Sequence, residues 1–209
     1  NSAIYFAGVN VGRDNMTFLI TDLQNNIIKE EYDYTFELLD RPQCIERICT
    51  NIENFIATCG IDRGKILGLG VCMTGRVNPD TGRSYKYFTT SEQSLRDLLE
   101  ERVGIRVLLE NDTRARADAL CRLGGFEPKT AMEFDQQMTA YLAGCSGAGI
   151  TFVSSVLVSR LSPNPGICYY RLPEPESRRD IRLFWKRGRY KTRAMEAFLA
   201  MPPENGGEG

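Results

Sequence analysis

The chain has 209 residues, 42% of them hydrophobic, a formal net charge of −1 and no histidine. This length and composition suffice for one sizeable core or two small ones, and the near-neutral charge excludes a general attraction to nucleic acid or to anionic membranes. The lack of histidine excludes Ser-His-Asp triads and most catalytic zinc sites, so any chemistry must use carboxylates, Lys, Arg or the backbone.

Three short strands in meander spacing open the predicted fold. They cover residues 4–9, 16–21 and 27–34. Gly8, Asn10 and Gly12 belong to the first strand and the turn that follows it. A glycine-flanked turn allows backbone amides to approach a phosphate closely, and a plain hairpin explains the same pattern.

Apolar residues at intervals of three and four predict an amphipathic helix over residues 41–59, which ends at Gly60. A buried strand over residues 66–73 follows, and an irregular loop begins at Thr74 and Gly75. Such a loop lies at the carboxyl end of a strand, where α/β folds bind ligands. The sequence therefore places a candidate ligand site at this loop.

A second helix is predicted to begin at a Ser91 cap, with Glu92 in its first turn. The strand predicted over residues 105–109 then leads to Asn111 and Asp112. A carboxylate at a strand end can act as a general base toward a hydroxyl, and an Asn-Asp pair at this place is equally well explained by a helix cap.

Two motifs in this half carry a family resemblance. They are Gly68-x-Gly70-x-x-x-Thr74-Gly75-x-Val77-Asn78 and Glu110-Asn111-Asp112. With the element order β-β-β-α-β-α-β, residues 4–116 resemble the amino-terminal lobe of the ROK family, which contains bacterial sugar kinases and sugar-responsive repressors. The resemblance implies a ribonuclease H-like (actin-like ATPase) lobe with a mixed sheet.

The ROK resemblance also implies roles for individual residues. It implies sugar-binding residues Asn111, Asp112, Thr74 and Gly75, and phosphate-binding residues Gly8, Asn10 and Gly12. In a kinase, Asp112 would be the catalytic base that deprotonates the attacking sugar hydroxyl, with ATP and Mg as cofactors. Asn10, however, stands where such kinases usually carry an acidic residue. We therefore expect an eroded phosphate site without cofactor, as in the repressor branch.

The second half does not continue as a ROK protein would, because it lacks that family's Gly-His element and histidine/cysteine zinc site. Four strands are predicted over residues 130–134, 150–153, 167–172 and 181–186. Three helices are predicted over residues 135–145, 154–158 and 192–199, the first of them capped by Asp135. No metal site is expected.

Several glycine and apolar motifs of this half have a recognisable spacing. They are Gly125-Phe126-x-Pro128, Gly147-x-Gly149-Ile150-x-Phe152-Val153, Arg179-x-Ile181-x-Leu183 and Ala197-Phe198-Leu199. Residues 118–201 thereby resemble the carboxyl-terminal part of LysR-type transcriptional regulators. The resemblance implies a periplasmic-binding-protein-like α/β subdomain in which Gly147, Gly149 and Phe152 line an effector cleft. A helix-to-strand turn that needs glycine is the alternative explanation.

Seven cysteines are dispersed through the chain, and no two have CxxC spacing. They are Cys44, Cys49, Cys59, Cys72, Cys121, Cys145 and Cys168. We expect reduced, buried thiols and a cytoplasmic location. No apolar stretch approaches the roughly 20 residues that a membrane span needs, and no signal-peptide pattern is present.

These observations predict a composite of two domains, residues 1–117 and 118–209, joined naturally or by engineering. The first functional hypothesis is a non-catalytic module that senses a sugar or another small effector, derived from bacterial transcriptional regulators and lacking their DNA-binding domain. Such a module would not contact nucleic acid or membrane directly. Formation of a homodimer is compatible with the sequence. The alternatives are a sugar kinase that uses Asp112 and a structural chimera without activity.

Overall fold

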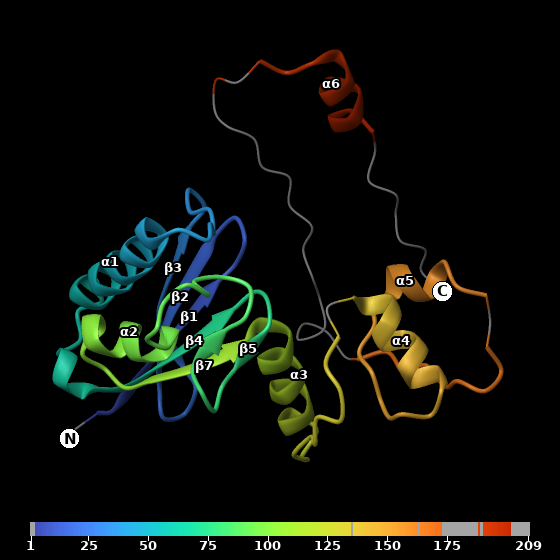
Figure 1. Cartoon of the computed structure of the whole chain (residues 1–209), viewed down its shortest axis with the longest axis horizontal. Helices are drawn as coiled ribbons and strands as arrows, with labels where there is room; N and C mark the ends of the chain where they lie inside the picture. The colour runs from blue at the N-terminus through green and yellow to red at the C-terminus, as the bar shows by residue number, and fades with distance from the viewer. Residues whose placement is uncertain (1–2, 135, 163, 173–187, 189, 202–209) are drawn as a thin grey trace. The chain divides into compact units, whose positions relative to one another are not determined.

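The computed structural model describes residues 3–134, 136–162, 164–172, 188 and 190–201 (Figure 1). The chain divides into two compact units, Asn1–Thr130 and Ala131–Gly209. The predicted join after residue 117 falls inside helix α3 (Asp112–Leu123), which belongs to the first unit.

The first unit is built on a five-stranded mixed sheet with the strand order β3-β2-β1-β4-β7. Its strands are β1 (Tyr5–Val11), β2 (Met16–Asp22), β3 (Ile27–Asp33), β4 (Ile66–Met73) and β7 (Val107–Asn111). β1, β2 and β3 pair antiparallel, as the meander spacing predicts, while β1, β4 and β7 run parallel. β7 begins two residues later than predicted.

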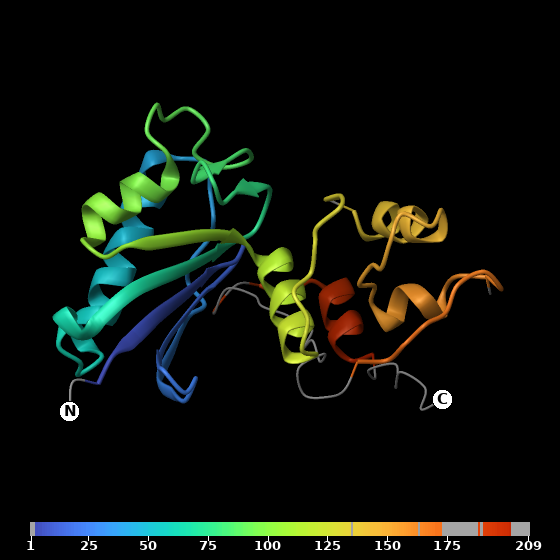
Figure 2. The ribbon, with the colours of Figure 1, turned by 90° about the horizontal axis from the view of Figure 1, so that it is seen from below.

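One face of this sheet is covered by helices α1 (Pro42–Thr58) and α2 (Leu95–Val103), which lie on the same side of it (Figure 2). Buried residues alternate along the strands, and the apolar stripe of α1 packs onto them. The largest fully buried side chains are Phe36, Met16, Ile20, Ile48, Ile52, Leu69, Met73 and Leu99. The sheet therefore has a helix-covered core face.

Helix α2 begins three residues later than the sequence predicts. Ser94, not Ser91, is the cap, and its Oγ accepts a hydrogen bond from Asp97 N (3.1 Å). The guanidinium of Arg83 binds the backbone carbonyls of Ser91 and Glu92, which keeps those residues in the preceding loop. The cap thus lies directly before Leu95, the first buried residue of the helix.

The second unit contains α4 (Gln137–Cys145), α5 (Ser155–Ser159) and α6 (Arg193–Leu199). These confirm the three predicted helices, but the strands predicted over residues 130–134, 150–153 and 167–172 are wrong. Asp135 and residues 181–186 lie outside the described residues. A strand needs a partner ladder, and among the described residues of this unit only Tyr141 is buried, so the apolar alternation there has no sheet to join.

All seven cysteines are free, as predicted. Only Cys44, Cys49 and Cys121 are buried, however, and Cys168 is exposed, so the expectation of uniformly buried thiols is wrong. Cys168 belongs to the unit whose described part buries little apolar surface, which accounts for its exposure. Every helix in the described part of the chain is too short or too polar to span a bilayer.

Loss of a core side chain should affect stability far more than loss of a side chain from the opposite sheet face. Leu99 is 1% exposed, whereas Leu108 on β7 is 69% exposed. We expect Leu99→Ala to lower the free energy of unfolding by about 2–5 kcal/mol and Leu108→Ala by less than about 0.5 kcal/mol. Urea denaturation measures both changes, and equal losses would contradict this assignment of the core.

Asp33, at the end of β3, ties this edge strand to α1. Its Oδ2 accepts hydrogen bonds from Asn51 Nδ2 (2.9 Å) and Arg47 (3.3 Å), and its Oδ1 accepts from Thr35 N (2.8 Å). Burial raises the pKa of Asp33, the hydrogen bonds of Thr35 and the charge of Arg47 lower it, and the net pKa lies below the ordinary value of an aspartate. The folded state therefore favours the ionised carboxylate.

A pKa lowered by folding stabilises the native state above the unfolded pKa, and this stabilisation is lost as the pH falls through the folded pKa. We expect Asp33→Ala to destabilise the chain by about 1 kcal/mol at pH 7. The difference from the unsubstituted chain should shrink as the pH is lowered toward 3. Urea midpoints at the two pH values measure this change, and a difference that does not depend on pH would disprove it.

Candidate functional site

The carboxyl ends of the three parallel strands bring most of the predicted ROK-type residues to one edge of the sheet. Asn10 pairs with Cys72, and Met73 pairs with Asn111, so β1, β4 and β7 end side by side. Thr74 N donates to Val11 O (3.2 Å), which places the start of the loop after β4 beside the end of β1. The sugar-binding candidates therefore form one cluster.

Asn111 is the central polar contact of this edge. Its Oδ1 caps α3 by accepting hydrogen bonds from Thr113 N (3.0 Å) and Arg114 N (2.9 Å). Its Nδ2 donates to Gly75 O (2.8 Å). The side chain thus acts as the helix cap that the sequence leaves open as an alternative, and it also fixes the loop after β4.

Asp112 is the first residue of α3 and is partly exposed at the same edge. Its Oδ1 accepts from Thr113 N (2.7 Å) and Thr113 Oγ1 (3.3 Å). Burial, followed by the carboxylates of Glu110 and Asp112, raises the pKa of the Cys72 thiol. The raised pKa favours the neutral thiol form of Cys72.

An ion pair that sequence reasoning missed supports Asn111. Glu110 Oε1 accepts hydrogen bonds from Asn111 N (2.5 Å) and Arg114 Nε (2.7 Å), with both side chains partly buried. The spacing of four residues between Glu110 and Arg114 was the available signal. Glu110 compensates the Arg114 charge locally, so its carboxylate serves the junction of β7 and α3.

The loop after β6 (Arg83–Ser84) also reaches this edge and was not predicted to do so. β6 pairs with β5 (Val77–Asn78). Gly75 has a φ of +95°, and a Cβ atom there would lie 3.1 Å from Lys86 Cδ and 3.4 Å from Tyr87 Cε2. The left-handed backbone conformation favours glycine here, and a side chain at Gly75 would press on the side chains of Lys86 and Tyr87.

The predicted phosphate residues are occupied by hairpin contacts. Gly12 N donates to Asn15 O (2.9 Å), which closes the turn between β1 and β2. Gly8 lies within β1, where a Cβ would approach the Leu19 side chain to 3.1 Å, and Asn10 is exposed. Of these three residues, only Asn10 presents a side chain at the carboxyl edge, and that side chain is an uncharged amide.

In the second unit, the first of the predicted effector residues, Gly147, lies at the carboxyl end of α4. Gly147 N donates to Gly144 O (3.0 Å) and Ala148 N donates to Ala143 O (3.2 Å), with Gly147 at a φ of +84°. This pair of bonds is a Schellman motif, in which glycine after the cap accommodates the left-handed backbone. Gly149 and Phe152 follow as exposed residues.

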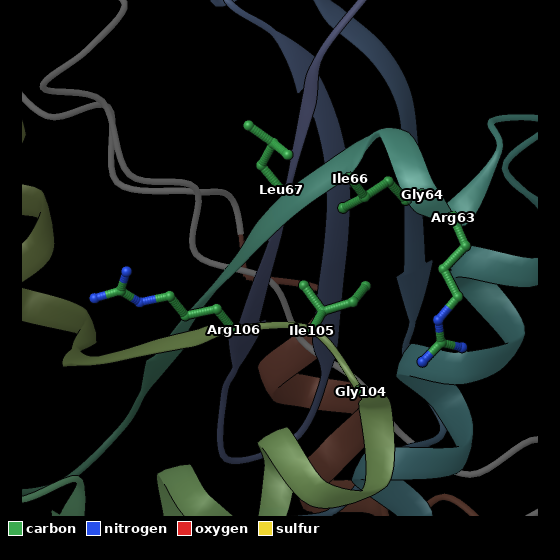
Figure 3. A pocket seen from close by; sticks show the side chains of 7 residues that line it. All are labelled: Arg63, Gly64, Ile66, Leu67, Gly104, Ile105 and Arg106. Carbon is green, nitrogen blue, oxygen red and sulfur yellow. The ribbon is translucent and has the colours of Figure 1, made fainter.

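A shallow depression of about 440 Å³ lies at the opposite, amino-terminal end of β4 and β7. Arg63 and Arg106 line it with Leu67 and Gly104, but the two guanidinium groups point away from each other (Figure 3). It is therefore a poorer candidate than the carboxyl edge, where the polar groups converge. Within the described ranges, no three His, Cys, Asp or Glu side chains gather as a metal site would require.

The two uses of the Asn111 side chain can be separated by substitution. We expect Asn111→Ala to lower the free energy of unfolding by about 2 kcal/mol, because it removes both the helix cap and the bond to Gly75 O. Asn111→Asp keeps a capping oxygen and loses only the Nδ2 donor, so about half of that loss is expected. Urea denaturation distinguishes them: equal losses would show that the helix cap contributes nothing, and no loss in Asn111→Asp would show that the Gly75 bond contributes nothing.

Two family models match the chain. The ROK family model matches residues 6–143, and the LysR substrate binding domain model matches residues 84–204. Each match spans more than half of the chain, and the two overlap over residues 84–143, so each extends further than the resemblance in the sequence predicts.

Individual relatives match a little over half of the chain. The xylose repressor of Bacillus subtilis (strain 168) is 25% identical over 119 residues, which are 54% of this chain and 29% of the repressor. A ROK family transcriptional regulator, a homolog of the E. coli MLC protein, has a TM-score of 0.47 and 23% identity over 55% of this chain and 29% of its own.

A ROK family glucokinase from Streptomyces griseus, solved with glucose and AMPPNP, has a TM-score of 0.47 and 22% identity over 57% of this chain and 37% of its own. The chain thus spans less than a third of the xylose repressor. On the evidence of the two family matches, the chain belongs to the ROK family and also carries a LysR substrate binding domain.

Proposed function

We propose that the chain is a non-catalytic module that senses a sugar or another small effector, derived from bacterial transcriptional regulators. The main support is the carboxyl edge of the sheet, where Asn111 binds Gly75 O and Asp112 follows at a partly exposed position. A carboxylate held beside a fixed loop suits a polyhydroxy ligand, because sugar hydroxyls donate hydrogen bonds to it.

Asp112 retains hydrogen-bonding capacity for such a ligand. Both of its hydrogen bonds within the described part of the chain use Oδ1, which leaves Oδ2 available. The loop after β6 adds Tyr85 and Tyr87 near Gly75, with Arg76 5.2 Å from the Tyr85 ring and Lys86 5.7 Å from the Tyr87 ring. Aromatic faces of this kind pack well against the apolar face of a sugar ring.

The second part contributes a separate proposal, which is that residues after the join near residue 117 form a periplasmic-binding-protein-like subdomain. Gly147, Gly149 and Phe152 would then border its effector cleft. The LysR substrate binding domain match over residues 84–204 supports this assignment.

A sugar kinase remains the competing function, with Asp112 as the general base. It is supported by the ROK family match, because that family contains sugar kinases as well as repressors. Asn10 argues against it, because an amide cannot supply the negative charge that would help hold Mg beside the phosphates. Gly12 N, which could otherwise bind a phosphate, is occupied by Asn15 O.

A titration of the intact chain with D-xylose and D-glucose tests this proposal. We expect one of these sugars to raise the thermal midpoint saturably, without phosphorylation when ATP and Mg are added. Asp112→Asn should weaken that sugar at least fivefold. Asp97→Asn is the matched control, because Asp97 also lies in the first turn of a helix, α2, and should leave the affinity unchanged.

Sugar phosphorylation that disappears in Asp112→Asn would establish the kinase and refute the non-catalytic proposal. If neither sugar shifts the midpoint at saturating concentration, the sugar-sensing proposal fails. An equal loss of affinity in both variants would place the ligand somewhere other than at Asp112.

A further inference from the structure

The loop formed by Tyr85, Lys86, Tyr87 and Phe88, which we name the 85–88 loop, is fixed at both of its ends. At its start, Ser84 Oγ accepts hydrogen bonds from Tyr87 N (3.1 Å) and Lys86 N (3.4 Å). At its end, Phe88 N donates to Asp40 Oδ1 (2.5 Å). The middle of the loop lies against Gly75, whose carbonyl is bound by Asn111.

Phe88 has an unusual backbone conformation for a bulky residue. Its φ is +60°, in the left-handed region that favours glycine, and its ring is buried with 8% exposure. Residues with large side chains adopt this region only when surrounding contacts enforce it. Here, the contacts that enforce this conformation are the hydrogen bond that Phe88 N donates to Asp40 and the burial of the Phe88 ring.

Asp40 is well suited to hold the loop because its own segment is anchored. The neighbouring side chains of Phe36 and Leu38 are buried, and Leu38 N donates to Arg13 O (2.8 Å) in the β1–β2 turn. Helix α1 begins two residues after Asp40. The carboxylate therefore projects from a segment fixed to both the sheet and α1.

We propose that Asp40 is a positioning residue for the sugar site: it holds the 85–88 loop closed against Gly75 and so preorganises the edge that carries Asn111 and Asp112. This inference rests on the proposed function for its ligand, and on the contacts of Phe88 and Gly75 for its geometry. A loop held in place before binding loses less conformational entropy on binding, so the contact should appear as affinity.

Hydrogen exchange of the intact chain tests the loop directly. In Asp40→Ala, we expect the amides of the 85–88 loop to exchange at least tenfold faster, while those of α1 and β4 keep their protection. Asp40→Asn retains an acceptor oxygen without charge, so its loop amides should exchange at a rate between those of the unsubstituted chain and Asp40→Ala. Glu37→Ala, an exposed carboxylate in the same segment, is the control and should change nothing. Tryptic cleavage after Lys86 should accelerate in the same order.

Sugar titration of the same variants tests the consequence. Whichever of D-xylose or D-glucose binds the unsubstituted chain should bind Asp40→Ala at least fivefold more weakly, with Glu37→Ala unaffected. Unchanged loop exchange in Asp40→Ala would overturn the positioning contact itself. Faster exchange with unchanged affinity would overturn its role in the sugar site. If neither sugar binds the unsubstituted chain, the proposed function fails, while the exchange result still decides whether Asp40 holds the loop.

Discussion

The side-chain amide of Asn111 is the contact on which the geometry of the first unit's carboxyl edge depends. Its oxygen caps α3 by accepting hydrogen bonds from two backbone amides of the first turn. Its nitrogen donates a hydrogen bond to the carbonyl of Gly75 in the loop after β4. One planar group therefore fixes both the start of α3 and the position of a neighbouring loop. Asp112 follows directly, so its location is set by the same two contacts. The Glu110 carboxylate adds to this by binding Asn111 N.

The same residues satisfy structural demands and the demands of a binding site. A helix cap requires a short polar side chain just before the first turn, which at α3 is also the end of β7. Presenting an amide to a sugar at this edge requires the same kind of side chain at the same place. Gly12 closes a hairpin, although the sequence resemblance implies a phosphate contact there. Gly147 ends a helix, although the sequence resemblance implies an effector cleft there. A family motif of this type therefore partly reflects the requirements of backbone geometry.

Much of the first unit can be predicted from its sequence, because its signals are local. The apolar spacing of α1 and the alternation along β1 and β2 follow from the periods of helix and strand. The α2 cap could not be chosen correctly, since both Ser91 and Ser94 suit that role and the decision depends on which carbonyls Arg83 binds. The contact of Asp40 with Phe88 joins residues 48 positions apart, and no local pattern reports it. The wrong strands of the second unit show that alternation without a neighbouring ladder is insufficient.

The unequal burial in the two units has a consequence for unfolding thermodynamics. The buried apolar residues of the described chain lie in the first unit, with the exception of Tyr141. The heat capacity change and the denaturant m value both scale with the surface exposed on unfolding. Among the described residues, the first unit therefore supplies nearly all of the apolar surface that unfolding would expose, so it should dominate both quantities.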